Sequence, residues 1–255
     1  MTELQYDGTF AGFLTCVFHS FDQKLAEPLI VPQASAAPAI FSEAQFFGTE
    51  AAKAERVWRG LCRKLSKDAA EKIWYAFLSE EPGIENRLLG AIRYIFATPV
   101  SVENDFGHKD ILYLNQTARR VWREKHRMEA FVRFELIDDN FWYAPVEPSC
   151  NVLPLIVAHF TSRYADMDWL IFDQKRKYGI LYDHASGRDE EVSIDYGQGV
   201  SKMANPLPEH EKETAYRELW QKYFRHVNIP ERKNLKLQLR NMPRRYWKYL
   251  PEKSG

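Results

Sequence analysis

The sequence has no apolar run near the roughly 18 residues that a membrane span needs, which excludes a membrane-spanning protein. Its three cysteines, Cys16, Cys62 and Cys150, cannot all pair and lie far apart, as is typical of a reducing cytoplasm. The opening residues lack the basic and then apolar pattern of a secretory signal peptide. We therefore expect a cytoplasmic protein with no membrane partner.

Patterns that bind cofactors are missing as well. There is no Cys-x-x-Cys pair and no group of three cysteines that could hold an iron–sulfur cluster. The seven histidines are scattered, with no two at the i, i+4 spacing of a helical metal site. Gly197-Gln198-Gly199 is not followed by the rest of a dinucleotide or phosphate-loop pattern. We expect neither a metal nor a cofactor in this chain.

What the 255 residues do contain is ample material for a core, since 45% are hydrophobic. Their periodicity predicts an α+β fold with a helical half, a small antiparallel sheet of ββαββ order and a helical C-terminal tail. We expect five segments: an N-terminal helical segment (1–31), a linker or loop (32–48), a helical subdomain (49–130), a small α+β subdomain (131–200), and a basic helical tail that packs on the body (201–255).

Local signals place individual elements within these segments. An apolar stripe predicts a helix over about residues 10 to 26, with Thr9 as its N-cap, and Ser66 is a second cap. Alternating runs predict hairpins at 131–137 with 141–146 and at 169–173 with 178–183, a weaker strand at 191–196, and a helix over about 152–164 between the hairpins. In the tail, helices are expected over about 209–226, 230–239 and 244–250.

The charge is balanced overall, with 35 Lys and Arg against 35 Asp and Glu, but it is unevenly distributed. Residues 231–255 hold eight cations and two carboxylates, and residues 117–133 hold six cations and two carboxylates. Residues 183–196 hold five carboxylates and one cation. Our central hypothesis is that the two basic stretches meet in space and form one groove that attracts anions.

The basic tail is interleaved with aromatic residues, which is typical of a surface that binds phosphates and stacks on unpaired bases. The candidate nucleic-acid-binding residues are Arg232, Arg244, Arg245, Tyr246, Trp247 and Lys248, together with Lys175 and Arg176 at the tip of the second hairpin. Two alternatives stay open. The aromatic residues can bury against the body while the arginines face the acidic segment 183–196, and the hairpin tip can be an ordinary solvated turn.

Catalytic candidates are weaker. His159, Arg163 and Asp173 can serve an enzyme that acts on a flipped base, provided that they line one cleft. Asp166, Asp168 and Asp173 offer oxygen ligands for Mg²⁺, but without a second acidic cluster at a recognisable spacing we expect no metal site.

Several strings resemble those of an uncharacterised bacterial family usually labelled "probable DNA metabolism protein", built on a domain of unknown function (DUF4130). They include Tyr6-Asp7-Gly8-Thr9-Phe10, Asn151-Val152-Leu153-Pro154-Leu155-Ile156 and Met242-Pro243-Arg244-Arg245-Tyr246-Trp247. The resemblance implies work alongside a radical S-adenosylmethionine (radical SAM) iron–sulfur protein. Related domains are fused to domains similar to uracil-DNA glycosylase, which implies DNA repair or modification. It assigns no catalytic residue.

Three hypotheses follow. The first is a DNA-binding accessory protein in DNA repair or metabolism that contacts single-stranded or damaged DNA and acts with a radical SAM partner. The second is an enzyme acting on a damaged or modified nucleobase or nucleotide. The third is a protein-interaction module without DNA affinity that docks through residues 183–196. Whether the protein is an enzyme stays open at this stage.

Overall fold

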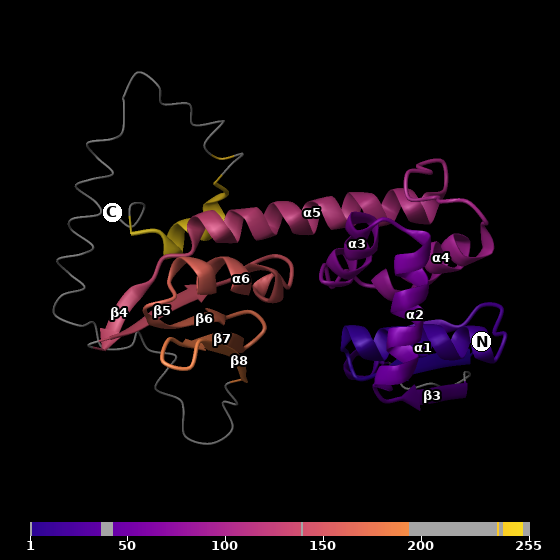
Figure 1. The fold of residues 1–255 in the computed structure, drawn as a ribbon, viewed down its shortest axis with the longest axis horizontal. Helices are drawn as coiled ribbons and strands as arrows, with labels where there is room; N and C mark the ends of the chain where they lie inside the picture. Colours follow the sequence, from indigo (N-terminus) through magenta and orange to yellow (C-terminus); the bar gives the residue numbers. More distant parts are fainter. Residues whose placement is uncertain (1, 37–42, 139, 194–238, 240–241, 252–255) are drawn as a thin grey trace. The chain divides into compact units, whose positions relative to one another are not determined.

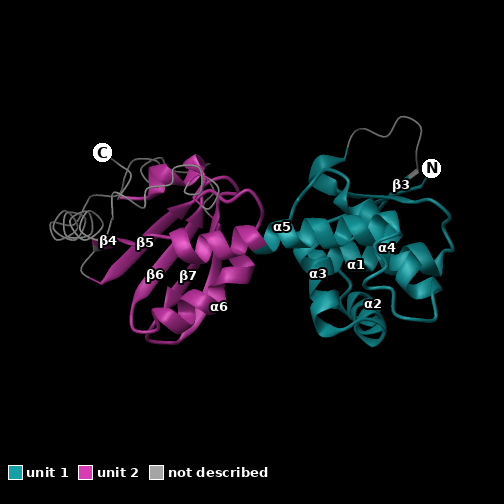
Figure 2. Ribbon diagram, turned by 90° about the horizontal axis from the view of Figure 1, so that it is seen from above, with its two compact units in different colours: residues 1–122 teal, residues 123–255 magenta. Residues whose placement is uncertain are grey.

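A computed structural model describes residues 2–36, 43–138, 140–193, 239 and 242–251 of the chain (Figure 1). The chain divides into two compact units, residues 1–122 and residues 123–255 (Figure 2). Each unit has its own sheet, so each is described separately below.

Unit 1 contains a three-stranded sheet of β1 (Thr2–Tyr6), β2 (Leu29–Pro32) and β3 (Glu43–Phe47). The order is β2-β1-β3, and both neighbours run parallel to the central strand β1. Leu4 and Tyr6 alternate along β1 and are almost completely buried. The buried Tyr6 hydroxyl donates to Glu85 at 2.9 Å, which gives the phenol a partner inside the core.

The helices of unit 1 supply most of its core. They are α1 (Phe10–Asp22), α2 (Ala51–Lys64), α3 (Lys67–Phe77) and α4 (Ile84–Ala97), and the first part of α5 (Lys109–Phe131) belongs to the same unit. Both predicted N-caps are confirmed, because Thr9 accepts from the Gly12 N–H at 2.9 Å and Ser66 from the Ala69 N–H at 3.3 Å. Helix α4 ends before Pro99, as the proline predicts.

Asp7 joins two loops of unit 1 at the ends of β1 and β3. One carboxylate oxygen accepts from Thr9 N–H at 3.0 Å and Oγ1 at 2.7 Å, and the other from Thr49 N–H at 3.2 Å and Oγ1 at 2.6 Å. Although partial burial raises the pKa of Asp7, the hydrogen bonds from Thr49 and Thr9 outweigh it and hold the pKa below its usual value.

Unit 2 contains a five-stranded sheet in the order β4-β5-β6-β7-β8. The strands are β4 (Glu135–Asp138), β5 (Phe141–Val146), β6 (Asp168–Asp173), β7 (Tyr178–Asp183) and β8 (Arg188–Ser193). Helix α6 (Leu153–Arg163) connects β5 to β6, and the short 3₁₀ helix η3 (Arg244–Tyr249) contacts β5. The central strand β6 is the most buried, with Trp169 fully enclosed.

The α+β class is confirmed, but two features of the sheets differ from expectation. Strands β5 and β6 pair in parallel, so the sheet is mixed rather than antiparallel. A helix joins them and returns the chain to the starting end of the sheet, which makes the next strand parallel to the first. The parallel sheet of unit 1 was not predicted: β1 and β2 lie in the segment expected to be helical, and β3 lies in the expected linker.

Only one of the three helices expected in the tail can be compared with the structure. The helices expected over 209–226 and 230–239 lie outside the described residues, except for residue 239. The helix expected over 244–250 is present as the 3₁₀ helix η3. Among the described residues, no helix combines the length and the apolar composition that crossing a membrane requires.

Candidate functional site

Within unit 2, the tail segment η3 is held against α5 by Tyr246 and Arg245. The Tyr246 side chain is buried, and its hydroxyl donates to Glu124 on α5 at 2.6 Å. The Arg245 guanidinium donates to the same carboxylate at 2.8 Å and lies 4.6 Å from the centre of the Tyr246 ring. These two candidate nucleic-acid-binding residues therefore make contacts within the protein.

Glu124 is the carboxylate on which this segment depends, and its side chain is only 2% exposed. It also accepts from the Ser149 N–H at 2.7 Å and lies 3.5 Å from the Arg127 guanidinium. Burial by itself raises the pKa of a carboxyl group, but the Tyr246 hydroxyl, the Ser149 N–H and the Arg245 charge outweigh that and lower the pKa of Glu124. Parts of the two basic stretches do meet here, around a carboxylate of the protein itself.

The other tail candidates have varied surroundings. Lys248 is paired with Glu147, which also accepts from the Tyr249 hydroxyl at 3.0 Å. The Trp247 indole N–H donates to a backbone carbonyl at 3.1 Å, and exposed Arg244 lies 5.8 Å from the centre of the Trp247 ring. Arg232 lies outside the described residues.

At the tip of the β6–β7 hairpin, Lys175 and Arg176 have different roles. Arg176 pairs with the fully buried Asp173 at 2.7 Å, and its own side chain is 9% exposed. It also donates to the Pro148 carbonyl at 3.1 Å, so its position is set by the loop before α6. Lys175 is exposed, and its backbone N–H donates to Asp173 at 2.8 Å. Lys175 and Lys177 are therefore the exposed cations of the tip, whereas Arg176 is held by Asp173.

The three catalytic candidates make separate sets of contacts. Asp173 ends β6 and is used by the hairpin turn and by Arg176. His159 and Arg163 lie one turn apart on α6, where His159 contacts the Phe160 ring edge-on and Arg163 contacts Tyr164. Among the described residues, no hydrogen bond or ion pair joins Asp173 to His159 or Arg163. The enzyme hypothesis requires one cleft lined by His159, Arg163 and Asp173, and the described residues form no such cleft.

One group in unit 2 has the composition of a metal site. Asp168, Asp183 and His184 place one ligand atom each within 4.8 Å of one another. The His184 ring nitrogen lies 2.7 Å from Asp168, and this hydrogen bond raises the pKa of His184. The pKa of Asp168 is lowered first by the His184 backbone N–H, at 2.9 Å, and then by the ring. Asp168 and His184 thus form a hydrogen-bonded pair, while the Asp183 carboxylate accepts from the Ala185 N–H at 3.0 Å.

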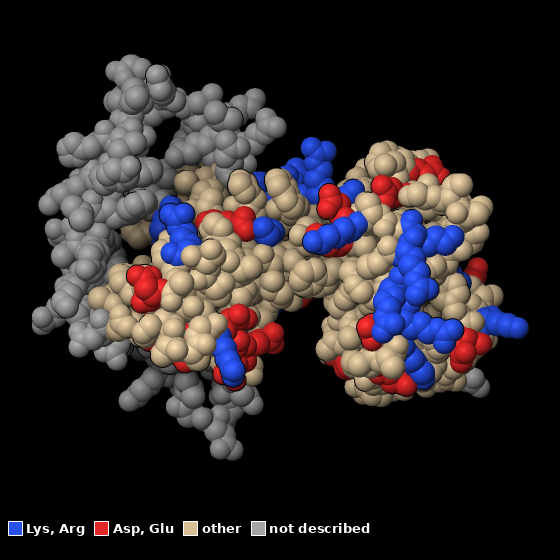
Figure 3. Space-filling view, viewed as in Figure 1, with Lys and Arg blue, Asp and Glu red and all other residues tan. Residues whose placement is uncertain are grey.

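A basic surface that the sequence analysis did not single out lies on unit 1. Helix α2 carries Lys53, Arg56 and Arg63 at positions that fall on one helical face. Figure 3 shows Lys and Arg side chains gathered over the face of unit 1 that carries α2. The signal was present in the sequence, because residues 51–64 hold five cations and one carboxylate.

Aromatic rings from the two neighbouring helices accompany these cations. Lys53 and Arg56 lie 5.6 and 5.5 Å from the centre of the Phe18 ring on α1. On α4, Arg93 lies 6.0 Å from the centre of the Phe21 ring, and Phe96 meets that same ring edge-on at 5.6 Å. We call Phe18, Phe21, Lys53, Arg56, Arg63, Arg93 and Phe96 the basic–aromatic surface.

Carboxylates neutralise only part of the basic–aromatic surface. Glu50 pairs with Lys53 at 2.7 Å, and its second neighbour is the His19 ring at 3.0 Å. Within the described part of the chain, neither Arg56 nor Arg63 has a carboxylate partner, and both side chains are exposed. Phe21 is 41% exposed and lies beside Arg93, which donates to the backbone carbonyls of Leu25 and Ala26 and has no carboxylate partner among the described residues.

Comparisons with known proteins give a family and little more. A family model described as a domain of unknown function (DUF4130) matches residues 82–252. No curated protein matches the sequence. A solved structure of a pGpG-specific phosphodiesterase, PggH from Vibrio cholerae, aligns with a TM-score of 0.30 and 11% identity over 71% of this chain and 80% of that chain. That likeness is too low to show a shared fold, and it carries no argument about function.

Proposed function

The chain belongs to the DUF4130 family, a domain of unknown function, and we propose that it binds single-stranded nucleic acid through the basic–aromatic surface of unit 1. The observation that carries the proposal is that Arg56 and Arg63 are exposed and have no carboxylate partner among the described residues. Arg56 lies 5.5 Å from the centre of the Phe18 ring, and the partly exposed ring of Phe21 follows one turn later on α1.

Each chemical group of this surface matches one part of a single strand. Guanidinium groups release counterions when they bind phosphates, which favours association at low salt. Aromatic faces stack on bases that are not paired, at about 1–3 kcal/mol per base. In a duplex the bases are already stacked on one another, so an exposed ring such as Phe21 favours a single strand as the ligand.

We further propose that the strand is DNA and that the protein is an accessory factor in DNA repair or metabolism. The support for this role is the resemblance to proteins labelled for DNA metabolism, which also implies a radical SAM partner. In this proposal the partner holds the iron–sulfur cluster. Arg244, exposed and stacked by Trp247, and Lys175 at the hairpin tip can contribute further phosphate contacts.

The test is fluorescence anisotropy with a labelled oligo-dT of about 16 nucleotides, a length that spans one typical binding site. The double variant Arg56→Ala/Arg63→Ala is expected to weaken binding about tenfold at low salt, because two phosphate contacts are lost. The slope of log K against log salt is expected to fall by about 1.4, at roughly 0.7 per contact with a single strand.

The matched control is Lys67→Ala/Lys109→Ala, which removes the same charge from the same unit. Lys67 is 88% exposed at the start of α3 and Lys109 is exposed at the start of α5, so neither belongs to the basic–aromatic surface. If both double variants weaken binding equally, the effect comes from the overall charge of the protein and not from the basic–aromatic surface. Unchanged binding in Arg56→Ala/Arg63→Ala, with circular dichroism as in the wild type, would refute the proposal.

A further inference from the structure

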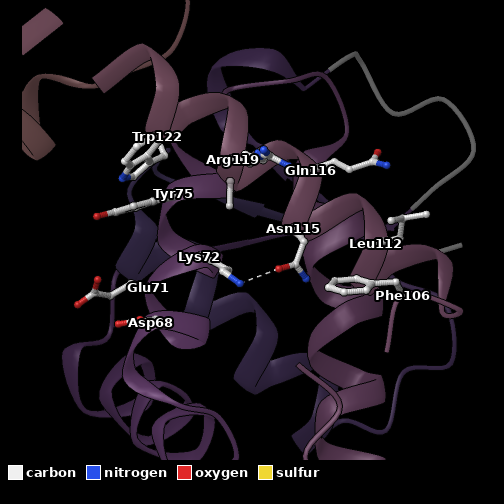
Figure 4. A pocket seen from close by; sticks show the side chains of 11 residues that line it. Asp68, Glu71, Lys72, Tyr75, Phe106, Leu112, Asn115, Gln116, Arg119 and Trp122 are labelled. Atoms are coloured by element: carbon white, nitrogen blue, oxygen red, sulfur yellow. Dashed lines mark hydrogen bonds between the residues drawn. The ribbon is translucent and has the colours of Figure 1, made fainter. Parts of the chain in front are cut away.

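A second feature of unit 1 is a hollow of about 760 Å³ between α3 and α5, within the range of sites that bind small molecules. Figure 4 shows Trp122 and Tyr75 toward one end of it, Phe106 and Leu112 toward the other, and Lys72 between them. Leu112 and Trp122 are ten residues apart on α5, so the hollow extends about 15 Å along that helix.

Its apolar lining is unusually exposed. Trp122, Phe106 and Leu112 are 52%, 51% and 38% exposed, and they are three of the six large hydrophobic side chains that are exposed in the described part of the chain. Exposed apolar side chains that gather around one depression are typical of a binding site, since contact with a ligand removes them from water.

The charged group at the centre is held in place and is not neutralised. Lys72 donates to the side-chain oxygen of Asn115 at 2.8 Å. The Asn115 amide N–H groups donate to the carbonyls of Ile111 at 3.0 Å and Glu103 at 3.4 Å, which orients its oxygen toward Lys72. Within the described residues Lys72 has no carboxylate partner, so two of its three N–H groups remain for a ligand.

Asp68 and Glu71 line the same hollow without neutralising Lys72. Among the described residues Asp68 has no ion pair, and Glu71 has only a 4.0 Å approach to the exposed Lys67. The hollow thus presents aromatic walls, one ammonium donor and two carboxylates that can accept hydrogen bonds.

We propose that this hollow binds a nucleotide, with the base against Tyr75 and Trp122, the phosphate on Lys72, and hydroxyl or amino groups of the ligand on Asp68 and Glu71. The same chemistry has two sources, a free mononucleotide or the 5′-phosphorylated end of a single strand. If the ligand is a strand end, the inference rests on the proposed function. If the ligand is a free mononucleotide, the inference is independent of the proposed function, because the hollow lies on α3 and α5 rather than on α2.

The combination of groups selects this class of ligand. An aromatic acid satisfies Lys72 but brings no donors to the two carboxylates, and an aromatic amine satisfies the carboxylates but leaves Lys72 without an anion. A nucleotide carries the ring, the anion and the donors together. Lys72 and Tyr75 lie three residues apart on α3, about 5–6 Å between their Cβ atoms, so one ligand can reach both.

The test is calorimetric titration of the full chain with deoxyadenosine 5′-monophosphate, deoxyadenosine and inorganic phosphate. The monophosphate is expected to bind at least about tenfold more tightly than either fragment, because only it fills both parts of the site. Lys72→Met should weaken the monophosphate about tenfold and leave deoxyadenosine within about twofold, whereas Trp122→Ala should weaken both. Lys67→Met, on the same helix but outside the hollow, is the matched control and should change neither.

A monophosphate that fails to bind at about 5 mM, or that binds equally to Lys72→Met, would overturn the inference. Anisotropy with 5′-phosphorylated and unphosphorylated strands separates the two sources. A preference for the phosphorylated strand that disappears in Lys72→Met supports the strand end, and monophosphate binding without that preference supports the free nucleotide. Arg56→Ala/Arg63→Ala should leave monophosphate binding unchanged, so failure of the basic–aromatic surface and failure of the hollow give different results.

Discussion

Glu124 shows how a single buried carboxylate can decide what neighbouring cations do. An ionised carboxylate that is 2% exposed is stable only when its oxygens receive hydrogen bonds and positive charge. Here Tyr246, Arg245 and the Ser149 N–H supply them. In return, the carboxylate fixes the η3 segment on unit 2.

Glu124→Ala should lower the free energy of unfolding by about 2–4 kcal/mol, because the buried Tyr246 hydroxyl and the Ser149 N–H lose their acceptor. Urea titration followed by circular dichroism measures this. The matched control is Glu147→Ala, which removes the 43% exposed acceptor of Lys248 and should cost less than about 1 kcal/mol. Equal costs for the two variants would show that Glu124 has no special part in the fold.

Which cations are neutralised could not be predicted from the sequence. A count of charges identified Arg245 and Arg176 as cations, but it could not show that Glu124 and Asp173 neutralise them, because those partners are brought together only by the fold. Arg56 and Arg63 carry the same charge in the sequence and differ only in lacking such partners among the described residues.

At the scale of elements, the start of α1 depends on a glycine. A Cβ at Gly12 would collide with an Asp7 carboxylate oxygen, which accepts from Thr9. The helix therefore begins where only glycine leaves room for the carboxylate that links the loops after β1 and β3.

Gly12→Ala should lower the free energy of unfolding by about 1–3 kcal/mol, since either Asp7 or the helix must shift. In the Asp7→Ala background the same substitution should be neutral or stabilising by up to about 1 kcal/mol, because the obstacle is gone and alanine is the better helix former. Urea titration of the four proteins of this cycle gives the coupling. Additive costs would show that Asp7 is not the group that Gly12 accommodates.

Elements with a strong local signal were predicted well. Helix α1 with its Thr9 cap, helix α6 and the two hairpins of unit 2 follow from periodicity and capping residues a few positions apart. The sheet of unit 1 was missed because its strands are four or five residues long and pair with partners distant in sequence. Parallel pairing of this kind leaves no turn residues to recognise.

At the scale of the whole molecule, seven of the described carboxylates share a downward pKa shift. Hydrogen bonds and nearby cations hold the pKa of each below its usual value: Asp7, Glu50, Glu81, Asp105, Glu124, Glu147 and Asp168. His184 is the opposite case, with a pKa raised above 6.5 by Asp168.

The sign of the pH dependence follows from these directions. A carboxyl whose pKa is lower in the folded state contributes stability above its unfolded pKa, 4.5 for a glutamate, and loses it as the pH falls through the folded pKa. The contribution of His184 is complete below 6.5 and is lost as the pH rises through its higher folded pKa. The free energy of unfolding should therefore decline slightly toward alkaline pH and fall steeply below about pH 4.5.

Urea titrations at a series of pH values between about 3 and 8 measure this profile. His184→Asn should remove the shallow alkaline decline and make the acid limb only slightly less steep, because Asp168 loses the imidazole but keeps the backbone N–H of residue 184, the larger of the groups that lower its pKa. Glu124→Gln should make the acid limb less steep, because the most enclosed of the seven carboxylates no longer takes up a proton on unfolding. A free energy of unfolding that stays constant down to about pH 3 would contradict the shared downward shift of these pKa values, and with it the ionised state of Glu124 that holds η3 to unit 2.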